Sequence, residues 1–233
     1  KKILSAMNIK GAELAGYEAD DIIGTFAKMA EEKNILSIVV TGDKDSLQLI
    51  NEFTVVKLPV TKQGTTTTDT YDIEAFKAKY NGIMPKGLID LKAHMGDSSD
   101  NIPGVMGVGE KTAISLISEY GNLDGVYEHI DEIKKPALKS KLETGKESAY
   151  MSYELATIMC NVPVSQTIDD FKRTEYNNSE LLSLFTMLEF KSIIKKLKID
   201  SNAVLNKDVS SAGTDADSAA VADAGADSAT GAG

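Results

Sequence analysis

The sequence predicts an α/β protein with a mostly parallel sheet, followed by a helical region. Three observations support this. Strand-like apolar runs alternate with helical patterns over residues 1–71, which is typical of a parallel sheet. Helical periodicity continues over residues 72–199, which predicts a second, helical region. Clusters of acids and glycines lie where the predicted elements end, and ligands of such sheets bind beyond the carboxyl ends of the strands.

The first part begins with apolar residues at helical spacing over 3–9, which we interpret as the end of a helix. Residues 12–16 are predicted to form a short strand. A helix is expected over 20–33, because apolar side chains recur along one side of it. Acids gather at the start of this helix, where the helix dipole favours them.

A buried strand is predicted over 35–41, since it reads Ile-Leu-Ser-Ile-Val-Val-Thr and ends at Gly42. A short helix over 46–50 and a strand over 54–59 follow. Gly64 and the threonines after it predict a turn into a further strand. The expected helices of the second part cover 72–80, 86–96, 110–120, 123–130, 136–158 with a break near Gly145, and 179–197.

Residues 200–233 consist mainly of Ala, Ser, Asp and Gly. Such a segment buries too little apolar surface to offset the entropy of ordering it, so a disordered acidic linker or tail is expected. The formal net charge of the whole chain is −10. Six of the 35 acids lie in this tail and others are candidates for a metal site, so the overall charge does not exclude a nucleic-acid partner.

The candidate chemistry lies in three short acidic stretches. Their acids are Glu18, Asp20, Asp21, Asp43, Asp45, Asp97 and Asp100. Each acid alone is explained by a local role such as helix capping. Three stretches at element boundaries instead predict converging carboxylates, which suit the hard cations Mg²⁺ and Mn²⁺. Two such ions activate water and stabilise the leaving oxygen in phosphodiester hydrolysis.

A glycine-rich turn lies between the helices expected over 86–96 and 110–120. A helix precedes it where a dinucleotide-binding loop requires a strand. We therefore predict a helix–hairpin–helix whose backbone N–H groups hold a phosphate. The candidate DNA-binding residues are Gly104, Gly107, Val108, Gly109, Lys111 and Thr112. Arg173 is the only arginine, which favours gripping of the backbone over readout of base edges.

Other residue types narrow the choice. Cys160 is the only cysteine, which excludes a disulfide framework and a Cys-rich zinc site; we interpret it as a buried structural thiol. His94 is interpreted as a residue on a helix surface or partly packed. No apolar run approaches the ~18 residues of a membrane span, and no signal peptide is visible. A cytoplasmic, monomeric protein is expected.

Three motifs together resemble the 5′-to-3′ exonuclease, or flap endonuclease, domain of bacterial DNA polymerase I. They are Gly16–Thr25, Thr41–Asp45, and Gly96–Val105 with its continuation through Gly109–Ala113. The resemblance covers residues 1–199 and implies that the α/β part is the incomplete core of a PIN-like nuclease. It implies a magnesium-dependent, two-ion nuclease that acts on DNA with 5′ flaps, nicks or RNA primers in replication and repair. By motif position, the seven acids above are implied to be metal ligands or their close supports.

The resemblance also implies further metal-binding acids and a basic arch before residue 1, so an N-terminally truncated domain is expected. Polymerase domains are expected beyond the tail. One alternative is a catalytically incomplete fragment that acts only as a duplex-binding module without sequence preference. Another is a phosphate-binding metabolic enzyme, which leaves the glycine hairpin without an explanation.

Overall fold

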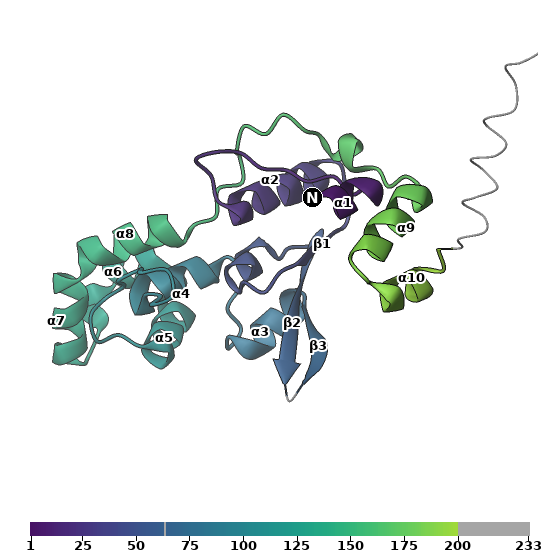
Figure 1. Cartoon of the computed structure of the whole chain (residues 1–233). Coiled ribbons are helices and arrows are strands. Elements are labelled where there is room, and N and C mark those ends of the chain that lie inside the picture. The colour runs from purple at the N-terminus through teal and green to yellow at the C-terminus, as the bar shows by residue number, and fades with distance from the viewer. Residues whose placement is uncertain (63, 200–233) are drawn as a thin grey trace, which may run out of the picture. The chain divides into compact units, whose positions relative to one another are not determined.

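The computed structural model of the chain describes residues 1–62 and 64–199 (Figure 1). The predicted tail over 200–233 lies outside the described residues. The chain forms two compact units by its internal contacts. The larger comprises residues 11–172, and the smaller combines residues 1–10 with residues 173–199.

A three-stranded sheet lies in the larger unit, with the strand order β1-β2-β3. The strands are β1 (Ser37–Val40), β2 (Thr54–Lys62) and β3 (Thr65–Tyr71). β1 pairs with β2 in parallel, as predicted, whereas β2 and β3 form an antiparallel hairpin. The antiparallel pairing follows from the short connection, because parallel neighbours need a crossover of a dozen or more residues.

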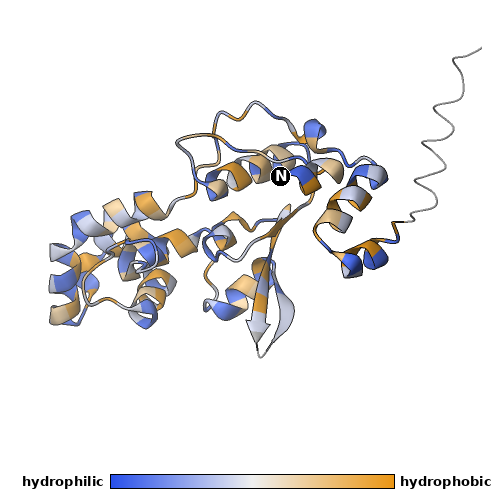
Figure 2. Cartoon of the chain, in the orientation of Figure 1, coloured by the Kyte–Doolittle hydropathy of each residue, from blue (hydrophilic) through white to orange (hydrophobic). Residues whose placement is uncertain are grey.

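The strand predicted over 35–41 is present as β1, but the prediction that it is buried is wrong. Only Val39 of β1 is buried, while Ile38 and Val40 are 60% and 64% exposed. The apolar run has the composition of a buried strand, but β1 lies at the edge of the described sheet. Strand β3 consists mainly of threonine and has near-neutral hydropathy in Figure 2.

Helix α2 (Ala19–Glu32) follows the prediction closely. The backbone N–H of Glu18 donates to Asp21 at 3.2 Å, which satisfies one of the free donors at this helix start. Thr25 is buried, and its hydroxyl accepts the N–H of Val162 at 3.0 Å. Helix α2 is therefore fixed to a segment more than 130 residues away in the sequence.

The predicted short helix after β1 is the 3₁₀ helix η1 (Asp45–Leu49). Helix α3 (Ile73–Lys79) follows β3 and is capped by Asp72, whose carboxylate accepts the N–H of Ala75 at 2.8 Å. Helix α4 (Gly87–Met95) packs against η1, α5, α6 and α8. Each residue from Leu88 to His94 is buried, so α4 is the central element of this unit.

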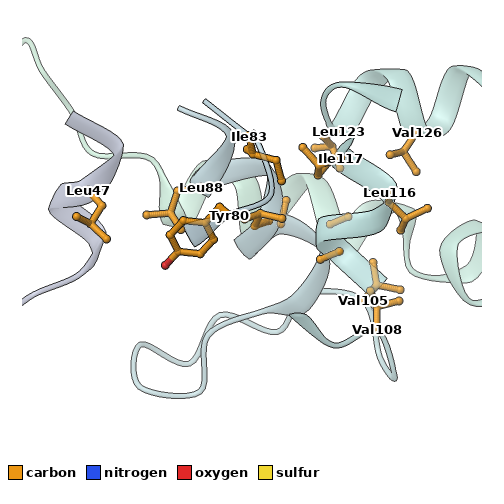
Figure 3. Packing of buried hydrophobic residues seen from close by; sticks show 14 of the residues in the cluster. Leu47, Tyr80, Ile83, Leu88, Val105, Val108, Leu116, Ile117, Leu123 and Val126 are labelled. Atoms are coloured by element: carbon orange, nitrogen blue, oxygen red, sulfur yellow. The ribbon is translucent and has the colours of Figure 1, made fainter. Parts of the chain in front are cut away.

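The remaining helices of this unit are α5 (Glu110–Tyr120), α6 (Leu123–Glu128), η2 (Ile130–Glu132), α7 (Pro136–Thr144), α8 (Lys146–Ala156) and η3 (Ile168–Phe171). Of these, α5, α6 and α8 pack against α4, α7 packs against η2 and α8, and η3 packs against α2. The predicted break near Gly145 is confirmed. One apolar cluster extends from Leu47 on η1 to Val105 and Val108 in the loop before α5 (Figure 3). This core fixes the backbone on either side of the candidate site.

The smaller unit contains α1 (Lys2–Ala6), α9 (Asn178–Met187) and α10 (Lys191–Leu197). Its core consists of Ala6, Leu181, Phe185 and Ile199. The helix predicted over 179–197 is thus two helices. Glu189 between them has a positive φ of 58°, which a continuous helix does not allow.

Three further predictions are corrected. Residues 12–16 form no strand, since their backbone is irregular and ends in a turn. His94 is fully buried in α4 instead of lying on a helix surface. The interpretation of Cys160 as a buried thiol is also corrected, since Cys160 is only half-buried and lies beyond the end of α8. Among residues 1–62 and 64–199, no helix has the length and apolarity to span a bilayer.

His94 makes one polar contact in this core, from Nδ1 to the carbonyl of Asp90 at 2.8 Å, and Nε2 has no partner among the described residues. Burial lowers the pKa of His94 below its ordinary value of 6.5. As the pH falls below ~6.5, the unfolded chain therefore takes up a proton that the folded chain does not. The free energy of unfolding is expected to fall as the pH falls through this range.

The test is urea denaturation of the wild type and a His94→Leu variant at several pH values between roughly 5 and 8. The variant should show a smaller loss of stability toward acid. His129→Leu is the matched control, because His129 makes the same contact one helix turn back, to Gly125 at 2.9 Å, but is exposed. The same acid sensitivity in wild type and His94→Leu would contradict this assignment.

Candidate metal and nucleic-acid site

Asp45 is placed by the turn that follows β1. The hydroxyl of Thr41 accepts the N–H of Asp43 at 3.0 Å, and the carboxylate of Asp43 accepts the N–H of Asp45 at 2.9 Å. Two successive side-chain-to-backbone bonds of this kind form a tight local turn. They direct the chain into η1, whose first residue is Asp45.

Asp97 and Asp100 lie in the loop after α4. Gly96 ends the helix with a φ of 72°, a value that glycine adopts without strain. Asp97 and Ile102 then exchange two backbone hydrogen bonds of 2.8 Å, which close a short loop containing Asp100. The Asp97 carboxylate also accepts the N–H and the hydroxyl of Ser99.

The fold brings these three aspartates together. One carboxylate oxygen from each of Asp45, Asp97 and Asp100 lies within 4.8 Å of the others. Asp45 and Asp97 are partly buried and Asp100 is exposed. Carboxylate oxygens in such a group are the ligands that Mg²⁺ and Mn²⁺ prefer, so the donor set fits a hard divalent cation.

The ammonium group of Lys92 lies among the same carboxylates. It forms ion pairs with Asp45, with Asp97 at 2.6 Å and with Asp100 at 3.8 Å. Lys92 projects from α4 and is only 4% exposed. A positive charge in this place offsets the mutual repulsion of the three carboxylates.

The pKa values show how closely these groups interact. Burial acts against the charged form of Asp97, but hydrogen bonds from Lys92 and Ser99 outweigh it and lower its pKa to about 2. Burial raises the pKa of Asp45, and the negative charges of Asp43 and Asp100 add to that effect, so its pKa stays raised despite Lys92. Burial also acts on Lys92, yet its bonds to Asp45 and Asp97 raise its pKa overall.

The first acidic stretch lies within electrostatic range of the second. Burial raises the pKa of Asp20, and the charges of Asp43 and Asp45 raise it further. Asp21 has a different surrounding, since its two carboxylate oxygens accept the N–H groups of Glu18 and Met159, the latter at 2.9 Å. Asp21 thus fastens the segment after α8 to the start of α2. Glu18 precedes α2 and is exposed.

The glycine hairpin runs from the aspartate loop to α5 and is fixed by α8. The N–H of Gly104 donates to the buried hydroxyl of Ser152 at 2.9 Å, and its carbonyl accepts the hydroxyl of Ser148 at 2.6 Å. Gly104 has a φ of 60°, and an added Cβ would lie 2.7 Å from Cα of Gly96. The backbone N–H and carbonyl of Gly104 therefore bond to α8, so Gly104 fixes the hairpin to the protein and is not free to bind a ligand through these groups.

The outer part of the hairpin faces solvent. Gly107, Gly109 and Lys111 are exposed, Thr112 is half-buried, and Val108 is buried in the apolar core. Within the described residues, no backbone acceptor takes the N–H groups of Gly107 and Gly109. Two N–H groups at the start of α5, near an exposed lysine, suit a phosphate oxygen.

The sequence does not identify the residues that contact this site from the protein interior. Lys92 occupies a helix position that reads as part of a buried stripe, so no spacing signal identifies it. Ser148 and Ser152 are one helix turn apart on α8, a spacing that places both on one face, but nothing in the sequence relates them to Gly104. Lys141 on α7 donates to the carbonyl of Gly107 at 3.2 Å.

An α/β unit with clustered aspartates next to a hairpin between two helices fits the class of nucleases with a helix–hairpin–helix. The comparisons with known proteins give the particular family. Residues 1–81 match the family model of the 5′-3′ exonuclease N-terminal resolvase-like domain, and residues 83–179 match that of the 5′-3′ exonuclease C-terminal SAM fold. The chain belongs to the 5′-3′ exonuclease family.

Curated relatives agree. The chain is 43% identical to DNA polymerase I of Caldicellulosiruptor bescii over 197 residues, which cover 84% of this chain and 23% of that protein. It is also 43% identical to DNA polymerase I of Bacillus subtilis over 201 residues, or 86% of this chain and 22% of that protein. The chain thus spans about a quarter of the length of the relatives it matches.

Solved structures have the same fold. T5 5′-exonuclease with bound zinc is 25% identical, has a TM-score of 0.52, and aligns over 63% of this chain and 52% of that one. The catalytic core of Rad2 in complex with a DNA substrate has a TM-score of 0.56 at 20% identity, over 80% of this chain and 62% of that one. The second likeness concerns the fold alone.

The hairpin geometry predicts a contrast between two glycine substitutions. Gly104→Ala should lower the free energy of unfolding by at least ~2 kcal/mol, because the left-handed conformation and the contact with Gly96 both oppose a methyl group. Gly109→Ala should leave it nearly unchanged, since φ is −103° and no atom lies within 4 Å of the added Cβ. Urea denaturation of both variants measures this, and equal stability would contradict the described packing.

Proposed function

We propose that this chain is the 5′-to-3′ exonuclease and 5′-flap endonuclease domain of a DNA polymerase I-like protein. Its substrates would be DNA with flaps, nicks or RNA primers, as in primer removal and repair. The observation that carries this proposal is the convergence of Asp45, at the start of η1, with Asp97 and Asp100, in the loop directly before the glycine hairpin. Metal ligands and a phosphate-holding turn are the two parts that backbone hydrolysis needs.

The first part of the proposal concerns the metal. Asp45, Asp97 and Asp100 would hold a divalent cation, with Mg²⁺ as the natural ion, and Asp20 and Asp43 lie close enough to affect the same region electrostatically. Bound in pairs, such ions activate water and stabilise the leaving oxygen of a phosphodiester. Support comes from the donor chemistry and from T5 5′-exonuclease, whose structure contains bound zinc.

The remaining acids take supporting roles in this proposal. Asp21 binds two backbone N–H groups and so positions the start of α2, where Asp20 and Glu18 lie. Asp43 shapes the turn that presents Asp45. These acids fix the geometry of the ligand set, and small displacements of ligands are costly in catalysis.

The second part concerns DNA. The exposed N–H groups of Gly107 and Gly109, with Lys111, would contact a backbone phosphate of the duplex region, with Thr112 at the same helix start. Gly104 and Val108 would hold this hairpin in place from the protein side. Because the contacts reach phosphates, they would carry no sequence preference.

A second candidate function is a duplex-binding module that does not cut. It is favoured by one observation: among the described residues, a single group of three acids meets the geometric requirement of a metal site, whereas two ions need more ligands. A labelled 5′-flap substrate in Mg²⁺ separates the two candidates in a single-turnover assay. Cleavage that disappears in Asp97→Asn supports the nuclease, and tight binding without cleavage in wild type supports the module.

Metal binding is testable without catalysis. Calorimetric titration with Mn²⁺ should show weaker binding in an Asp45→Asn, Asp97→Asn double variant than in wild type. The loss should exceed the ~10-fold that outer partners of a metal site typically contribute. Asp131→Asn is a suitable control, because Asp131 pairs with Lys139 at 2.6 Å on the surface. Equal Mn²⁺ affinity in wild type and double variant would contradict the site.

Duplex binding gives an independent test. Lys111→Ala should weaken the binding of every duplex sequence alike, by about 1 kcal/mol, and reduce the slope of log K against log salt by about 1. Gly109→Ala should also weaken binding, since its methyl group would lie where the phosphate approaches. Fluorescence anisotropy with two unrelated duplexes measures both effects. Lys77→Ala, a change on α3, is the control, and a strong preference for one duplex sequence would rule out this reading.

A further inference from the structure

The cation position between the three aspartates is already filled by a side chain. Lys92 contacts a carboxylate oxygen of each aspartate at ion-pair distance. No other ionic contact described for this protein joins one lysine to three carboxylates. The arrangement resembles a coordinated cation with an ammonium in the place of the metal.

Lys92 is also held there by its surroundings. Its neighbours Leu91 and Ala93 are fully buried, and α4 packs against other elements along its length. A surface lysine turns away from a competing cation at little cost, but a lysine that is 4% exposed in a packed helix does so only by moving through the core.

Removing a positive charge from among these three carboxylates, two of them partly buried and one exposed, has two opposite consequences. Without any cation, the carboxylates repel one another, and the folded state is less stable. With a divalent cation available, the repulsion between the ammonium and that cation is absent, so the cation binds more tightly. If Lys92 were only a structural ion-pair partner, its removal would lower stability but would not strengthen the binding of a divalent cation.

We propose that Lys92 is a built-in counter-ion of the metal site and a positioning residue. It keeps Asp45, Asp97 and Asp100 assembled in the absence of a divalent cation, and it weakens the binding of that cation so that the ion remains exchangeable. The proposal rests on the assignment of these aspartates as metal ligands under the proposed function. It does not require that the chain cleaves DNA.

The test compares wild type with Lys92→Met, a substitution that keeps much of the buried stem and removes the charge. Two quantities are measured: thermal stability in EDTA, and Mn²⁺ affinity by calorimetry. Lys92→Met should be less stable than wild type in EDTA, and Mn²⁺ should restore that stability. Its Mn²⁺ affinity should exceed that of wild type by about tenfold or more.

Lys139→Met is the matched control. Lys139 also pairs with two carboxylates, Asp131 at 2.6 Å and Glu143 at 3.8 Å, but on the surface of α7. Its replacement should change neither the Mn²⁺ affinity nor the response of stability to Mn²⁺. A gain in both variants would show a general effect of charge and would overturn the proposal.

A further variant keeps the test decisive if Lys92→Met does not fold in EDTA. Adding Asp45→Asn removes one negative charge together with the positive one, so the double variant should be more stable in EDTA than Lys92→Met. If neither Mn²⁺ nor Asp45→Asn restores stability, or if Lys92→Met binds Mn²⁺ no more tightly than wild type, the proposal is wrong.

The outcomes also separate this proposal from the proposed function. Mn²⁺ binding by Lys92→Met that Asp97→Asn abolishes supports the counter-ion role, even if wild type binds no Mn²⁺ and the nuclease assignment fails. Conversely, Asp97-dependent Mn²⁺ binding that is equally tight in wild type and Lys92→Met supports the metal site and overturns the role of Lys92.

Discussion

The site depends on helix α4, whose residues from Leu88 to His94 are all buried. This helix supplies a positive charge to the site and determines where the loop with two of the aspartates begins. Its Lys92 reaches back to Asp45 at the start of η1, and its C-terminal end at Gly96 starts the loop that contains Asp97 and Asp100. The ion pairs thus join the part of the chain that follows β1 to the part that forms the hairpin. A buried ion pair costs desolvation and contributes little net stability by itself, but it fixes which groups lie together. The main effect of these ion pairs is therefore to determine which side chains lie together, more than to stabilise the fold.

The glycine hairpin also depends on α4. The loop that ends α4 returns through Gly104 to contact Gly96, and α8 holds Gly104 by two serine hydroxyls. The aspartates and the exposed N–H groups of the hairpin are therefore set by one continuous piece of backbone. A metal ligand set and a phosphate contact built on one rigid support keep a constant separation, which suits a substrate whose phosphates are regularly spaced.

Much of the architecture could be predicted from the sequence because it follows local rules. Helix α5 begins after Gly109 and ends before Gly121 as its pattern indicates, and the break between α7 and α8 falls at Gly145. Burial was harder to predict. The apolar residues of β1 indicate a covered strand, yet Ile38 and Val40 are exposed at the described edge, because exposure depends on neighbours that a local pattern does not contain. The opposite error occurs for His94, which is predicted to lie on a helix surface or to be partly packed but is fully buried by the packing around α4.

The candidate site was predictable in its acids and unpredictable in its counter-charge. Asp45, Asp97 and Asp100 stand at element boundaries, where acids suggest a shared site, and they do converge. Lys92 lies in the middle of a helix, where a lysine usually points to solvent. Only the long-range packing of α4 reveals that it points at the acids. Asp21 presents a similar difficulty. It lies in a motif that resembles a metal site, but its carboxylate accepts the backbone N–H of Met159, a contact that the sequence alone does not indicate.

The central claim is that Asp45, Asp97 and Asp100 form a divalent metal site whose cation position Lys92 otherwise fills. The most direct measurement is a crystal structure of the chain with Mn²⁺, with the ion located by its anomalous scattering. The account predicts an anomalous peak within coordination distance of these three carboxylates, with the Lys92 ammonium displaced from at least one of its ion pairs. A peak elsewhere, or an unchanged Lys92 contacting all three aspartates at saturating Mn²⁺, would contradict it.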